Sequence, residues 1–140
     1  MAYCTPADLS KYGVSAVALS PIDPGVQSAA CDSASEVVDS YLRDRYRLPL
    51  SAWGVDIIRT TALIAVYDLL VVRGYNPSAG ADVNVRLRYE DALKWLQMVA
   101  RQEIQANVTP MQHDAAGFDD PRVLTNANRG WQNSSGKVFT

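Results

Sequence analysis

Hydrophobic positions recur at the spacing of an α-helix along most of the chain up to about residue 106. The opening "TPADLSKYG" predicts a short helix, with Thr5 as its cap, a proline in the first turn and Gly13 at its end. After a loop that contains "LSPIDPG", Asp23 and Pro24 begin a longer helix that runs to about Tyr46. The apolar face of this second helix comprises Ala30, Ala34, Val37, Val38, Tyr41 and Leu42.

Two further helices follow the second one. Pro49 must end the second helix, because the residue before a proline is pushed out of the α region. The third runs from about Val55 to Arg73 and is apolar on almost all sides, which is typical of a helix at the centre of a bundle. The fourth runs from about Val83 to Ala106, and its apolar side comprises Val85, Tyr89, Ala92, Leu96 and Val99. On its other side, charged residues spaced i,i+4 can pair, namely Arg86, Glu90 and Lys94. We therefore predict an all-α fold, a small bundle of about four helices.

The composition changes after Pro110, where the sequence becomes rich in Asn, Ser, Gly and Asp and loses its helical period. A solvent-exposed linker rarely contains so many large apolar residues, which here are Phe118, Val123, Leu124, Trp131, Val138 and Phe139. We predict a helical core over residues 1–106 and an extended arm over residues 107–140 that becomes ordered on a partner. Its last stretch, "SSGKVFT", could add a strand to a partner's sheet. The alternative is a C-terminal segment without a fixed conformation.

The stretch "YLRDRYRLPL" contains three arginines and raises the question of a basic binding site. Arg45 falls on the apolar side of the second helix, whereas Arg43 and Arg47 point elsewhere, so the three do not form one basic stripe. An arginine on an apolar face usually buries its stem and needs a carboxylate. Asp68 is surrounded by apolar residues in the third helix and needs a cation. We therefore predict that Arg45 or Arg59 pairs with Asp68, and that the stretch is a structural joint.

Length, charge and cysteine content restrict the class of protein. A chain of 140 residues, 48% hydrophobic and 20% charged, has the composition of one ordinary globular domain. A net charge of -2 argues against tight binding of nucleic acid through phosphate contacts. Cys4 and Cys31 are too far apart in sequence for a zinc motif or a disulfide framework, and Cys31 fits a small buried side chain. Without a signal-peptide pattern or a membrane-length apolar run, we expect a soluble intracellular protein.

Residue types that carry out catalysis are sparse in this chain. The one histidine, His113, falls in the irregular C-terminal part, and no nucleophile stands near it in a recognisable pattern. Neither glycine-rich phosphate-binding motif occurs. Asp119 and Asp120 precede Pro121, and such a sequence is more often a turn than an acid/base pair. We expect a protein that is not an enzyme, with no catalytic, cofactor-binding or metal-binding residues.

Three strings, in order, resemble a known family. "MAYCTPADL", "VVDSYLRDRYRLPL" and "RYEDALKWL" are similar to strings of the head–tail connector proteins (adaptor or head-completion proteins) of Mu-like phages and prophages. The similarity covers roughly residues 1–105, and the chain departs from the pattern between Ser15 and Asp23 and after Pro110. The resemblance implies a helical-bundle adaptor of the virion neck that has no catalytic residues.

The resemblance also implies partners and a location. Identical subunits would form a ring of roughly twelve copies beneath the portal protein. The ring would offer a docking surface to a tail terminator or another tail-side neck protein, and DNA would pass through the lumen without specific binding. Subunits would be made in the bacterial cytoplasm and end in the virion, with no role for a membrane and no cofactor.

Several residues are candidates for contacts with these partners. Trp95 lies at the margin of the apolar stripe of the fourth helix, where it is more often part of the core, and Met98 lies on the polar side. The candidates in the arm are Phe118, Trp131, Val138 and Phe139. The alternative function is a small helical DNA-binding or packaging-accessory protein that uses Arg43, Arg45, Arg47, Arg86 and Arg88. A third possibility, an enzyme fragment, requires a polar pocket.

Overall fold

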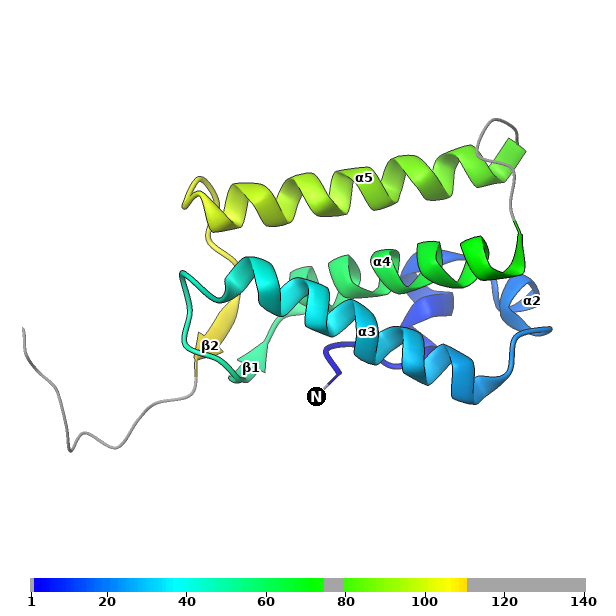
Figure 1. The fold of residues 1–140 in the computed structure, drawn as a ribbon, viewed down its shortest axis with the longest axis horizontal. Coiled ribbons are helices and arrows are strands. Elements are labelled where there is room, and N and C mark those ends of the chain that lie inside the picture. The colour runs from blue at the N-terminus through cyan, green and yellow to red at the C-terminus, as the bar shows by residue number, and fades with distance from the viewer. Residues whose placement is uncertain (1, 75–79, 111–140) are drawn as a thin grey trace, which may run out of the picture.

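A computed structural model describes residues 2–74 and 80–110 and confirms the predicted all-α class (Figure 1). Three long helices dominate the fold, and short elements cover their ends. In chain order the elements are α1 (Pro6–Asp8), the π-helical segment η1 (Leu9–Gly13), α2 (Ala16–Leu19), α3 (Pro24–Leu42), β1 (Leu50–Trp53), α4 (Val55–Arg73), α5 (Gly80–Ala100) and β2 (Val108–Pro110).

The helix α4 is the centre of the bundle and has the predicted bounds. It lies between α3 and α5 in the view of Figure 1 and packs against both, as well as against η1. Residues on several of its sides are fully buried, which confirms the expectation drawn from its apolar sequence; they are Ile57, Thr61, Ala62, Ile64, Ala65 and Val66. Thr61 is polar, and its Oγ1 donates a hydrogen bond of 2.8 Å to the carbonyl of Ile57 within the helix.

The first turn of the chain forms as its sequence predicts. The Asp8 carboxylate accepts a 2.8 Å hydrogen bond from the Thr5 backbone N–H, which is one half of a capping box. The helix continues as η1 and ends at Gly13, where a Cβ would lie only 2.4 Å from the Cγ2 atom of Val66. Glycine at this position therefore lets η1 approach α4 closely. The short helix α2, which begins after Ser15, was not predicted.

The helix α3 ends at Leu42 rather than near Tyr46. The backbone N–H groups of Arg45 and Tyr46 both donate to the Leu42 carbonyl, so the chain turns before it reaches Pro49. The prediction that Pro49 itself ends the helix is therefore wrong. Pro49 instead follows a cis peptide bond directly before Leu50, which is 1% exposed and belongs to the core. The early turn brings this leucine inward.

A two-stranded antiparallel sheet, which was not predicted, joins distant parts of the chain. In it Trp53 is paired with Val108, and Ala52 with Thr109. The Gly54 N–H adds a 2.7 Å hydrogen bond to the carbonyl of Asn107 beside the sheet. Residues 107–110, assigned to the arm from sequence, thus pack on the core. The rest of that arm, residues 111–140, lies outside the described residues.

The helix α5 ends at Ala100, earlier than the predicted Ala106, because the chain turns back toward the sheet. Gln102 has a φ of 65°, and the N–H of Glu103 donates to the carbonyl of Met98. This turn leads to Ala106, which is 4% exposed and packs in the core next to β2. The predicted apolar stripe of α5 is confirmed: Val85, Ala92, Leu96 and Val99 are buried, and Tyr89 is half-buried.

The residues before α1 pack along α3. The Tyr3 N–H donates a 2.8 Å hydrogen bond to Ser35 Oγ, and this hydroxyl donates to the Cys31 carbonyl at 2.7 Å. These contacts place Cys4 beside Cys31, and both side chains are buried. A hydrogen bond between the two thiols, together with burial, raises the pKa of the Cys4 thiol. The expectation that Cys31 is a small core residue is confirmed.

The buried thiol pair gives a first testable prediction. Because both cysteines are buried, a maleimide reagent at slightly alkaline pH should label neither thiol of the native protein while it labels a free exposed thiol. Denaturant should make both thiols reactive, as counted by intact mass. Full labelling of the native protein at the rate of a model thiol would contradict the packing of residues 2–5 on α3.

Candidate functional site

Arg45 connects the turn after α3 to the end of α5. Its Nη1 atom donates a 2.7 Å hydrogen bond to the carbonyl of Val99 and a second hydrogen bond to the carbonyl of Ile104. The last carbonyls of a helix have no partner within the helix, and a positive charge is favourable at that end. Arg45 is structural, as predicted, but its partners are backbone carbonyls. The predicted ion pair with Asp68 is not formed.

Asp68 lies beside tyrosines. Among the ion pairs of the described residues, none joins Asp68 to Arg45 or Arg59, so both versions of the prediction are wrong. The rings of Tyr67 and Tyr89 stack with centroids 4.0 Å apart, and the Asp68 charge acts on Tyr89. Asp68 is half-buried, and this burial raises the pKa of its carboxyl group. Partial exposure to water explains how the carboxyl is tolerated without either predicted partner.

Arg59 and Trp95 meet at a groove between α4 and α5 with a volume of about 290 Å³. The groove has apolar walls at Leu63, Ala92 and Trp95, and ionisable side chains at Asp56, Arg59 and Asp91. Trp95 is half-buried here, as its place at the margin of the apolar stripe predicts. Its exposed part and the apolar walls can accommodate an apolar side chain of another protein.

The other predicted contact residues are either on α5 or beyond the described part of the chain. Met98 is half-buried, and its carbonyl accepts the N–H of Glu103 in the turn after the helix. Phe118, Trp131, Val138 and Phe139 lie outside the described residues. The described residues therefore present Trp95 and Met98 as candidate contact residues, both on α5.

Two residues with important contacts were missed from sequence. The guanidinium of Arg88 donates to the carbonyls of Gly13 at 3.0 Å and Tyr12 at 2.5 Å, and so holds the end of η1 against α5. The Asp56 carboxylate accepts the N–H of Asn107 at 2.8 Å and thereby fixes the entry to β2. Both residues bind backbone groups, and no pattern of residue types in the sequence predicts such contacts.

Metal binding and membrane insertion find no support in the part of the chain that the structure describes. No group of three or more His, Cys, Asp or Glu side chains among residues 2–74 and 80–110 lies close enough to hold a metal ion. No described helix combines the length and the apolar content that are needed to cross a bilayer.

The hydrogen bonds of Arg45 give a second prediction. Arg45→Met keeps an apolar stem but leaves two partly buried carbonyls without their charged donor, and should lower the free energy of unfolding by about 1.5–3 kcal/mol. Chemical denaturation measures this loss. Arg43→Met and Arg47→Met, at exposed positions of the same stretch, are the matched controls and should change it by less than about 0.5 kcal/mol. Equal effects at the three positions would show that Arg45 has no structural role.

The raised pKa of Asp68 gives a third prediction. Because the folded protein holds this proton more tightly than the unfolded chain, the stability contributed by Asp68 is full below about pH 3.9 and falls as the pH rises through the raised pKa. Asp68→Asn should therefore stabilise the protein at neutral pH relative to the wild type, and the gain should vanish in acid. Denaturation at a series of pH values measures this difference. A gain that is independent of pH would contradict the assignment.

Comparison with known proteins places the chain among phage proteins. A family model described as "Bacteriophage Mu, Gp36" matches residues 3–123, which include every helix and strand described above. The "Mu-like prophage FluMu protein gp36" of Haemophilus influenzae is 29% identical over 118 residues, which are 84% of this chain and 72% of that protein. The resemblance to Mu-like phage proteins is thereby confirmed at the level of the family. This chain belongs to the Bacteriophage Mu Gp36 family.

Proposed function

We propose that this protein is a structural component of the virion of a tailed phage. In this role it is a head–tail connector that forms a ring beneath the portal and provides the surface on which the tail docks. The observation that carries the proposal is the family match over residues 3–123 in a helical bundle in which Arg45 and Arg88 bind backbone carbonyls inside the subunit. The role requires no catalytic step and no cofactor.

The contacts and the exposure of the arginines favour this role over DNA binding. Of the five arginines that the DNA-binding alternative requires, Arg45 and Arg88 donate to backbone carbonyls and Arg86 pairs with Glu90. Phosphate contacts depend on guanidinium groups that face the nucleic acid. Only Arg43 and Arg47 of that set are exposed in the structure. Within the "RDRYR" stretch, Arg45 is therefore a joint of the fold, and only Arg43 and Arg47 face solvent.

The charge of the chain is compatible with a ring around DNA. A net charge of -2 would leave few attractive contacts with phosphates in a lumen, so DNA could slide during ejection. In this proposal roughly twelve copies surround the channel, and the portal and a tail-side neck protein bind the two faces of the ring. The subunits would be made in the bacterial cytoplasm and located in the neck of the particle.

Contacts with other proteins are proposed for two parts of the chain. The groove beside Trp95 is an apolar site on a rigid pair of helices, which is where a partner side chain is best anchored. Residues 111–140 carry apolar side chains on a polar background, and we propose that they bind the portal or a neighbouring subunit.

Assembly with the cognate portal is the direct test and a fourth prediction. The purified protein mixed with its portal should form a ring on the portal that is visible by negative-stain electron microscopy. Deletion of residues 111–140 should weaken this docking, while circular dichroism shows an unchanged helical content. If the truncated protein docks normally, the role proposed for the arm is wrong, and if the full chain never docks, the connector proposal is wrong.

The DNA-binding alternative has its own test. A gel shift with duplex DNA that weakens steeply as salt is added would indicate phosphate contacts and would favour the packaging-accessory function. The connector proposal expects no shift of the free subunit. Arg43→Ala/Arg47→Ala is the informative variant, because it removes the two arginines of that set that are exposed.

A further inference from the structure

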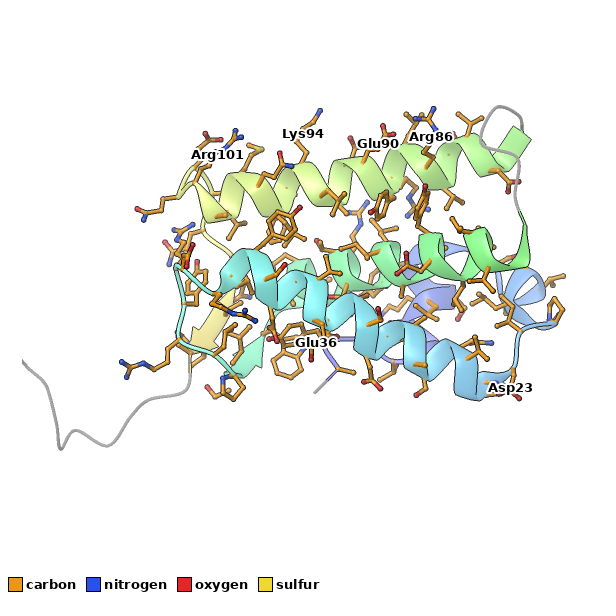
Figure 2. The ribbon with its side chains drawn as sticks, viewed as in Figure 1. Asp23, Glu36, Arg86, Glu90, Lys94 and Arg101 are labelled. Atoms are coloured by element: carbon orange, nitrogen blue, oxygen red, sulfur yellow. The ribbon has the colours of Figure 1, made fainter. Side chains whose placement is uncertain are left out.

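The outward face of α5 carries more positive than negative side chains. Arg86, Glu90 and Lys94 lie along this face, Arg101 directly follows the helix, and all four point away from the bundle in Figure 2. Glu90 is paired with Arg86, with 2.7 Å between Nη1 and Oε2. Lys94 and Arg101 are exposed, as is Asp91 at the edge of the face next to Met98, so the face has a small excess of positive charge. At 1.5 Å per residue the stripe from Arg86 to Arg101 is about 22 Å long, which is enough for a helix–helix contact.

Apolar side chains lie within this basic face. Leu87 is 45% exposed and stands seven residues before Lys94, on the same side of the helix. Met98, four residues after Lys94, is half-buried. A face that combines an exposed leucine and a half-buried methionine with a small net positive charge can serve as a protein-binding surface rather than a purely solvated one.

The helix α3 has the opposite charge. Positions 23–42 contain no lysine or arginine, and their acidic residues are Asp23, Asp32, Glu36 and Asp39. The exposed Arg43 caps the helix seven residues after Glu36 and on the same side, so the acidic face ends there. The Asp39 carboxylate accepts the Tyr3 hydroxyl, whereas Asp23, Asp32 and Glu36 are exposed. Their exposed neighbours are small, namely Ser28, Ala29, Ser33 and Ser40. Small side chains allow a second helix to approach this acidic surface closely.

The two charged faces point in different directions. In Figure 1 α3 crosses α4 and its C-terminal end approaches α5, and in Figure 2 Glu36 lies on α3 while Lys94 and Arg101 lie on the side of α5 that faces away from α3 and α4. One subunit therefore cannot satisfy the charge of its own α5 face with its own α3. Two different complementary patches on one molecule are what a head-to-tail contact requires, and repetition of such a contact gives a ring when the rotation between copies closes.

We propose that the outward face of α5 of one subunit binds the acidic face of α3 of the next copy in the ring. This inference rests on the ring-forming function proposed above. Lys94 and Arg101 contact Asp32 and Glu36 of the neighbouring copy, and Leu87 and Met98 pack between these charges. The opposite arrangement, with two α3 or two α5 faces together, brings like charges into contact and is disfavoured.

Charge reversal tests this contact with the full-length protein. Lys94→Glu/Arg101→Glu should weaken ring formation on the portal roughly tenfold or more, because like charges then face each other. Asp32→Lys/Glu36→Lys should have the same effect from the other side. All four changes in one chain restore opposite charges and should recover the ring, as scored by negative-stain electron microscopy and sedimentation. Raised salt should weaken the wild-type ring.

Control variants separate this contact from net charge and from loss of folding. Lys11→Glu/Arg47→Glu changes the net charge by the same amount at exposed sites outside both faces, and should leave the ring intact. Circular dichroism of each variant should show wild-type helix content.

The outcomes separate the proposed contact from the proposed function. If wild-type protein forms a ring and the Lys94→Glu/Arg101→Glu variant forms it equally well, the contact is wrong and the connector function stands. Loss of the ring without recovery in the four-change chain also overturns the pairing of α5 with α3. If wild-type protein forms no ring on the portal, the connector function itself fails.

Discussion

Burial of α4 is the constraint on which the rest of the structure depends. Its side chains are apolar on almost all sides, so a stable fold has to cover the helix from several directions at once. The helices α3 and α5 and the segment η1 do this, and Gly13 brings η1 so close that a Cβ would collide with Val66. The position of α4 therefore fixes where α3 and α5 lie, and with them the acidic and basic faces through which we propose that subunits meet.

Two arginines hold α5 on this core, and their use inside the subunit bears on function. Arg45 binds carbonyls at the C-terminal end of α5, and Arg88 ties the helix to the end of η1. Both guanidinium groups donate to backbone oxygens; the Val99 carbonyl also accepts the N–H of Gln102, and a buried carbonyl left without any donor costs about 1–3 kcal/mol. Two of the five arginines that suggest a nucleic-acid site in the sequence are thus committed to the fold, and the remaining charges suit contacts between proteins.

Sequence reasoning succeeded where structure follows from local periodicity and failed where it follows from distant backbone contacts. The bounds of α4 and the buried stripe of α5 were predicted because apolar residues repeat at helical spacing. The ends of α3 and α5 were placed too late, because turns that lead back to the core stop these helices. The partners of Arg45 and the pairing of β1 with β2 involve backbone groups far apart in sequence, so no residue type could reveal them. The predicted ion pair of Asp68 failed for a different reason: its carboxyl group is only half-buried, so it does not need a cation as a partner.

A cryo-electron microscopy reconstruction of the neck of the intact particle tests the central claim most directly. The account predicts a closed ring of this chain directly beneath the portal, in which the basic face of each α5 lies against α3 of the next subunit. A neck without density for this three-helix bundle, or this protein bound along packaged DNA inside the head, would contradict it.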